Sequence, residues 1–237
     1  MKKILVISVL FLVMGCEKEI PTKDVVTNPN DVYGVMHNEI LELYYSKNNM
    51  MKSVSVDEKM KIVDEYLIKK GYSFTFSKLV TPNSLYKKTA NLLNNYEMGF
   101  SDTYDLLETI YTAQEISFNE YSFSKDLLQV MQDNVGNSDK VLYYIRELEQ
   151  SIVSNKNYSS EEVNKFYLVL SITKHSIEYW KSVEIGANSK GMPWYVKDSV
   201  GAMTGMSTGL VGYATLLGGP IGGSLALLGS AALSSMI

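Results

Sequence analysis

Apolar side chains recur every three or four residues through most of this chain, which is the interval at which an α-helix repeats its faces. Similar runs continue to about residue 185, and they predict a succession of amphipathic helices. Only residues 72–80, where Phe74 and Phe76 alternate with other residues, indicate a short strand or an extended loop instead. The first helix is expected over roughly 31–47, with one apolar face formed by Val32, Val35, Met36, Ile40, Leu43 and Tyr44.

Capping residues indicate where several of these helices begin and end. Ser55 and Ser159 are each followed three residues later by a glutamate, the spacing of a capping box. Further start and stop signals are Thr81–Pro82, Ser101, Ser138, Gly71 and Gly136. The sequence therefore predicts an all-α domain over residues 32–190, an irregular helical bundle large enough to bury its own core.

The pattern changes after residue 190, where a glycine-rich segment over 191–237 is expected to form a helical hairpin. From Val200 to Ile237 there is no charged side chain, and Gly218–Gly219–Pro220 interrupts the run. The two arms, 200–217 and 221–237, contain 18 and 17 residues. As helices they would span about 27 Å or less, slightly under the roughly 30 Å of a bilayer core.

Small residues on each arm fall on one helical stripe. They are Gly201, Gly205, Gly209 and Gly212 on the first arm, and Gly222, Ala226 and Gly229 on the second. Each glycine weakens a helix by about 1 kcal/mol relative to alanine, so this many implies a packing role. Stripes of small residues let two helix backbones approach closely. A bend at residues 218–220 would bring one stripe against the other.

The tail resembles the glycine-zipper segments of membrane-active bacterial peptides, including bacteriocins, and of some envelope lipoproteins. The resemblance covers about 38 residues and rests on composition and glycine spacing. It leaves three fates open: insertion or assembly in lipid, docking on the chain's own helical domain, or disorder. Trp194 and Tyr195, just before the uncharged run, suit a membrane interface. Equally, Pro193 could begin a helix that docks on the helical domain.

The first residues of the chain fit the pattern of a secretory signal. Lys2 and Lys3 precede an apolar run over 4–14, which is too short to span a bilayer. Val13–Met14–Gly15–Cys16 then resembles the lipobox of bacterial lipoproteins. The resemblance implies a signal peptide over 1–15, lipid attachment at Cys16, and a tether over 16–31. The alternative is an ordinary signal followed by a free thiol, but the chain's only cysteine stands where a lipobox requires it.

Charge and composition argue against nucleic acid as a binding partner. Removal of the signal peptide takes the formal charge from -4 to -6, and no basic block remains to neutralise nucleic-acid phosphates. Glu17–Lys18–Glu19 resembles the charged surface-export signals of Bacteroidota lipoproteins, which favours an outer-membrane location in the bacterial cell envelope.

The seventeen tyrosines could line a peptide- or glycan-binding groove, or serve as ordinary residues at the core's edge.

Residues capable of catalysis or metal binding are sparse. His37 has no second histidine four residues away, and His175 with Glu178 lacks the second Glu-x-x-His pair of a bundle metal site. We expect His175 to be solvated or half-buried. No nucleophile elbow, phosphate loop or dinucleotide fingerprint occurs. The sequence therefore predicts neither a metal, a cofactor nor an enzymatic activity.

Two functions remain. The first is a non-catalytic, lipid-anchored envelope protein whose helical domain binds a partner and whose tail mediates packing, self-association or membrane contact. The alternative is a membrane-active or pore-forming protein similar to a bacteriocin, although an acidic body offers no cationic attraction to anionic lipid.

Overall fold

The computed structural model describes residues 27–47, 54–73, 75–78, 91–92, 97–183, 190–207, 210–212, 214–215 and 219–236. The fold is all-α, as predicted, and this described part of the chain contains no β-strand. Its helices are α1 (Asp31–Lys47), α2 (Val56–Lys69), α4 (Phe100–Thr112), α5 (Phe118–Asp133), α6 (Ser138–Ser154), α7 (Ser160–Ser182), α8 (Trp194–Gly205) and α10 (Gly222–Ser235). Two 3₁₀ turns, η1 (Phe76–Lys78) and η2 (Gly219–Ile221), accompany them.

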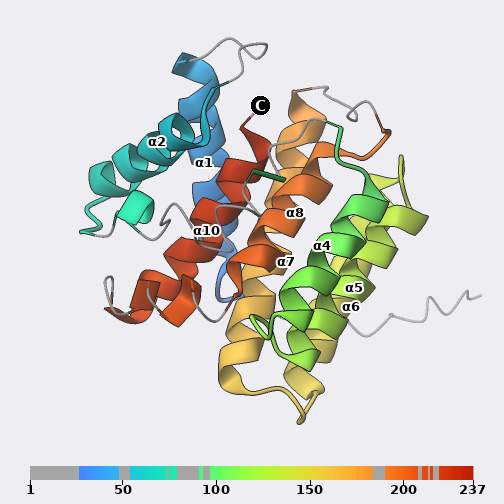
Figure 1. The fold of residues 1–237 in the computed structure, drawn as a ribbon. Coiled ribbons are helices and arrows are strands. Elements are labelled where there is room, and N and C mark those ends of the chain that lie inside the picture. Colours follow the sequence, from blue (N-terminus) through green and yellow to red (C-terminus); the bar gives the residue numbers. More distant parts are fainter. Residues whose placement is uncertain are drawn as a thin grey trace, which may run out of the picture.

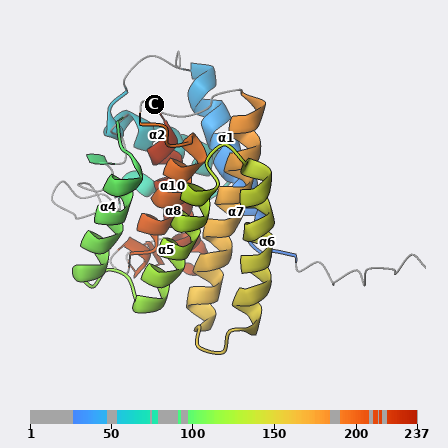
Figure 2. The ribbon, with the colours of Figure 1, turned by 90° about the vertical axis from the view of Figure 1, so that its right-hand side faces the viewer.

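The glycine-rich tail occupies the middle of the bundle. In Figure 1, α8 and α10 lie side by side between α1 and α2 on one side and α4, α5 and α6 on the other. Figure 2 shows the same helices after a quarter turn, with α7 and α6 running alongside each other. The tail helices contact α1, α2 and α7, so α1 and α10, which lie near opposite ends of the described chain, share one hydrophobic core. Residues from both sides of the predicted boundary between 190 and 191 contribute to this core.

Both tail helices are enclosed on every side. All twelve residues of α8 are buried, and Ser224 is the only residue of α10 that is not. A helix that is apolar or small around its whole circumference has no face suited to water, so it is stable only when other helices surround it. Their amphipathic neighbours provide that cover. Of the fates left open by the sequence, the structure shows the tail docked on its own chain.

The first arm of the tail differs from its predicted extent. Pro193 precedes α8, and its carbonyl accepts a hydrogen bond from the N–H of Val196. The helix ends at Gly205 instead of continuing to residue 217, and short helical turns follow at 210–212 and 214–215. The second arm begins after η2, where Gly219 has a φ of +67°. The break expected at residues 218–220 therefore includes a left-handed position that favours glycine.

Two predicted capping boxes are confirmed. The hydroxyls of Ser55 and Ser159 accept hydrogen bonds from the backbone N–H of Glu58 and Glu162. In return, each serine N–H donates to the carboxylate of the same glutamate. The expected start at Ser101 is wrong. There Gly99 is the cap, and its N–H donates to Asp102.

Other boundary predictions had mixed outcomes. The cap of α6 is Asn137, one residue before the expected Ser138. Phe76, part of the segment considered as a strand, lies in a 3₁₀ turn and is fully buried. The helix predicted after Thr81–Pro82 falls outside the described residues, except for helical residues 91–92. Among the helices that can be described, none combines the length and the hydrophobicity required to cross a bilayer.

Candidate functional site

Helices α8 and α10 pack closely against each other, and two of the predicted glycines make this packing possible. A methyl group placed on Gly201 would lie 2.7 Å from the carbonyl oxygen of Ser230 and 2.9 Å from Cα of Ala231. At Gly205 the nearest backbone atom would be Cα of Leu227, also at 2.9 Å. These separations are too short for any side chain, so the two helices can lie this close only because both residues are glycine.

The remaining predicted glycines make different contacts. Gly229 faces the ring of Phe76 from η1, and Gly222 faces the backbone of Ala214. Gly212 is exposed, and no described atom would come within 4 Å of a methyl group placed there. Gly209, like Cys16, lies outside the described residues. The neighbours of Gly201 and Gly205 on α10 are Leu227, Ser230, Ala231 and Ser234, not the glycines of the second predicted stripe.

Hydroxyl groups connect the tail to its neighbours. Ser234 donates to the carbonyl of Lys197 at 2.8 Å, which links α10 to α8. Tyr45 of α1 donates to the carbonyl of Ser235 at 2.7 Å, close to the C-terminal end of α10. Such bonds satisfy polar groups that water cannot reach.

A buried polar cluster joins α8 to α7 and α1. Asp198 of α8 has no exposed surface, and its Oδ2 accepts hydrogen bonds from the hydroxyl of Ser176 and, at 2.8 Å, from the indole N–H of Trp180. His37 of α1 is also completely buried, and its Nε2 lies 3.7 Å from the same carboxyl oxygen. The cluster therefore places a histidine and an aspartate against each other inside the core.

Burial shifts the protonation of these groups in opposite senses. It raises the pKa of Asp198 to about 7, against the opposing effects of its two hydrogen bonds and of Lys197. Burial lowers the pKa of His37 to about 4. Burial likewise lowers the pKa values of Lys197 and Lys59 to about 8 each. In each case the low-dielectric interior disfavours the charged form.

This cluster has the residue types of a hydrolase triad but not its geometry. A catalytic serine would bond to the histidine, which would in turn bond to the aspartate. Here the Ser176 hydroxyl donates to Asp198 directly. All three side chains are completely buried, so a substrate has no access to them in this conformation. The arrangement is suited to holding α1, α7 and α8 together and to binding a proton.

The second histidine belongs to a surface ion cluster. Nε2 of His175 lies 3.1 Å from Asp31, and its Nδ1 lies 3.6 Å from Glu178. Its side chain is 16% exposed, which confirms the predicted half-buried position. Lys174 also pairs with Asp31. Within the described residues no group of three or more His, Cys, Asp or Glu side chains could hold a metal ion.

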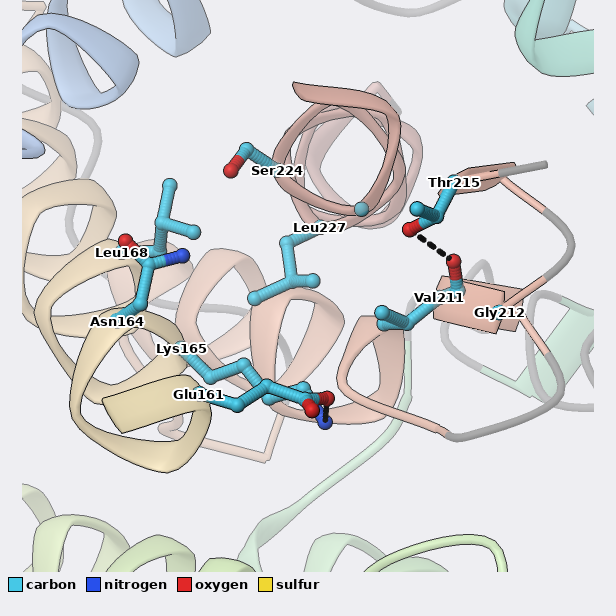
Figure 3. Close-up of a pocket in the computed structure, with 10 residues that line it drawn as sticks. Glu161, Asn164, Lys165, Leu168, Val211, Gly212, Thr215, Ser224 and Leu227 are labelled. Carbon is cyan, nitrogen blue, oxygen red and sulfur yellow. Dashed lines mark hydrogen bonds and ion pairs between the residues drawn. The ribbon is translucent and has the colours of Figure 1, made fainter. Parts of the chain in front are cut away.

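A cavity of about 540 Å³ lies beside the tail, between α7 and the connection from α8 to α10 (Figure 3). It is lined by Glu161, Asn164, Lys165, Leu168, Val211, Gly212, Thr215, Gly223, Ser224 and Leu227. Lys165 is almost fully buried, and its Nζ lies 2.7 Å from Glu120 and 3.0 Å from Glu161. The volume falls in the range of small-molecule sites. Lys165, the cation on its wall, is already paired with two carboxylates.

Comparisons of this chain with protein-family models, with curated proteins and with solved structures found no match. The candidate functional residues are therefore identified from the contacts and burial seen in this structure. Sequence reasoning found Gly201 and Gly205 from their spacing but did not find the pairing of His37 with Asp198. Those two residues are 161 positions apart, and no local pattern connects them.

Replacement of Gly201 tests the close approach of α8 and α10. We expect Gly201→Ala to lower the free energy of unfolding by about 2–3 kcal/mol, because the new methyl group meets backbone that cannot rotate away. Gly212→Ala is the matched control in the same uncharged segment. It should be neutral or stabilise by up to about 1 kcal/mol, because its site is open and alanine favours a helix. Equal effects in urea denaturation would contradict close packing at Gly201.

The cavity wall gives a second prediction. Glu120→Gln should destabilise the fold by about 3 kcal/mol, since it leaves the buried Lys165 ammonium without its enclosed partner. Glu161→Gln removes the other carboxylate, which is 71% exposed, and should cost about 0.5 kcal/mol or less. Thermal denaturation of both variants would measure the difference. A larger loss from Glu161→Gln would show that the enclosed ion pair is not the dominant one.

Proposed function

We propose that this chain is an exported, lipid-anchored protein of the bacterial cell envelope, without catalytic function, whose helical domain binds a partner. In this proposal Cys16 carries the lipid, and the glycine-rich tail is the central packing element of the domain. The observation that carries the proposal is the complete enclosure of α8 and α10 within the bundle.

Because α8 and α10 are enclosed in the bundle, the tail serves the packing of the domain and a different part of the chain must attach it to a membrane. Gly201 and Gly205 already face α10, and Gly229 faces Phe76 of η1, so these glycines offer no free stripe to a second copy. A tail in this position cannot hold the protein at a membrane without first leaving the bundle. Attachment through Cys16 needs no such change, and this favours the lipobox as the anchor.

A binding role is supported by exposed aromatic rings on the surface of the helical domain. The Asp198 cluster is inaccessible, whereas aromatic rings gather at the turn from α4 to α5. Phe118 there is 67% exposed and lies 6.5 Å from the ring of Tyr111. Tyr111 in turn stacks on Tyr121 at 4.4 Å. Exposed aromatic rings provide contact area for a protein or glycan partner.

Metabolic labelling with an alkyne-bearing fatty acid tests the anchor. We expect the wild-type chain, expressed in a bacterium with lipoprotein processing, to incorporate the label and to sediment with membranes. Cys16→Ser should lose the label and leave the membrane fraction, because no other cysteine is available. A wild-type chain that is exported but unlabelled would contradict the lipid anchor.

A second candidate, a membrane-active protein, is favoured by one specific observation. The bundle encloses two helices from a 38-residue segment that contains no charged side chain, and release of this segment would expose surface suited to lipid. Proteins that store such a segment must open before they act, so activity should increase when the packing is weakened.

Dye release from liposomes distinguishes the two candidates. The anchored binding protein should release no dye, either as wild type or as Gly201→Ala. The membrane-active protein should release dye, and Gly201→Ala should release more than wild type, whereas Gly212→Ala should not. If Gly201→Ala is destabilised in solution and still causes no leakage, the membrane-active candidate is excluded.

A further inference from the structure

The buried pair of His37 and Asp198 has an unusual feature, which is that each residue retains an atom without a hydrogen-bond partner. Neither side chain has any exposed surface. Nε2 of His37 and Oδ1 of Asp198 make no hydrogen bond in the described structure. Nε2 lies 3.7 Å from the other carboxyl oxygen, Oδ2. Buried polar atoms are usually satisfied, so two unsatisfied atoms within one residue pair require an explanation.

The position of the proton on His37 follows from its neighbour Asn38. The side-chain amide of Asn38 donates to the carbonyl of His175 at 2.9 Å, which turns its oxygen toward His37. That oxygen lies 3.1 Å from Nδ1 of the ring. Because a carbonyl oxygen can only accept, Nδ1 carries the proton and donates it. In the neutral ring Nε2 therefore has a bare lone pair, and this lone pair is on the side of Asp198.

The carboxyl of Asp198 is arranged in a complementary way. Ser176 and Trp180 both donate to Oδ2, so this oxygen acts as an acceptor. Oδ1 is left free to carry a proton. The pair thus offers two places for one proton, Nε2 of His37 and the carboxyl of Asp198, and neither side chain has exposed surface.

The ionisable groups around the pair are few. From α8, Lys197 acts on Asp198, and it also acts on Lys59 of α2. From α7, His175 acts on His37, and Tyr179 is affected by Asp198 and Glu42. The sequence of α10 contains no ionisable side chain.

We propose that folding moves one proton from His37 to Asp198, so that the pair enters the core uncharged and locks α8 against α1 and α7 at little cost over a wide range of pH. At pH 5 the unfolded chain holds one proton on the pair, on the imidazole, because free histidine and aspartate have pKa values near 6.5 and 3.8. The folded chain also holds one, on the carboxyl.

The equal proton count has a direct consequence for stability. Stability changes with pH only when the folded and unfolded states bind different numbers of protons. For His37 alone, a lowered pKa makes the fold less stable as the pH falls from about 6.5 toward 4. For Asp198 alone, a raised pKa makes the fold less stable as the pH rises from about 4 toward 7. In the intact pair these opposite effects cancel.

Separating the pair should reveal each effect. In Asp198→Asn, the unfolding equilibrium constant should rise about tenfold, relative to wild type, when the pH falls from 6 to 5. In His37→Gln it should instead fall about tenfold over the same interval. The double variant should follow the wild type, and so should His175→Gln, which alters the other histidine. Urea denaturation of the purified full chain measures all five proteins.

Proton location can also be observed without any variant. In the wild-type chain, nitrogen NMR should show the His37 ring neutral, with the proton on Nδ1, at pH 5. A cationic His37 at pH 5 would overturn the proposal, as would single variants whose pH dependence matches that of the wild type. If a single variant does not fold, the NMR result alone decides. Neither measurement depends on lipid attachment, so its outcome is separate from that of the proposed function.

Discussion

The fold depends on the short distance between the backbones of α8 and α10. Because Gly201 and Gly205 have no side chains, backbone atoms of α10 occupy the space that a Cβ would need. A closely packed helix pair gains many van der Waals contacts, but it presents small or apolar residues in all directions. Such a pair requires cover, and the amphipathic helices α1, α2 and α7 provide it. The central position of α8 and α10 in the bundle is therefore consistent with the close approach that these two glycines allow.

The close approach of α8 and α10 also limits which polar side chains can lie in this core. Serine and threonine are small enough to lie near the helix contact, and their hydroxyls bond to nearby carbonyls, as Ser234 does with Lys197. Asp198 differs from these hydroxyl groups, because it places a carboxyl where it has no exposed surface. Its hydrogen bonds to Ser176 and Trp180 tie the start of the tail to α7. A tail held in this way is a structural core first, and any membrane role requires it to leave the bundle.

Local signals in the sequence predicted the helices well, because capping and periodicity are local effects. The bounds of α1 and the boxes at Ser55 and Ser159 are clear in the chain. The box at Ser117 has the same serine–glutamate spacing and could have been found. The partner of the glycine stripe could not, since spacing shows only that something approaches closely. Likewise His37 and Asp198 meet through tertiary packing, which no motif encodes.

Hydrogen exchange followed by mass spectrometry tests the central claim that the glycine-rich tail forms the core of this fold. If the claim is correct, backbone amides in 194–205 and 222–235 exchange only through global unfolding, and their protection equals the largest found anywhere in the chain. Exchange of these segments that is faster than that of α5 or α6 would contradict it. That result would show a tail docked on the surface of a bundle that is stable without it.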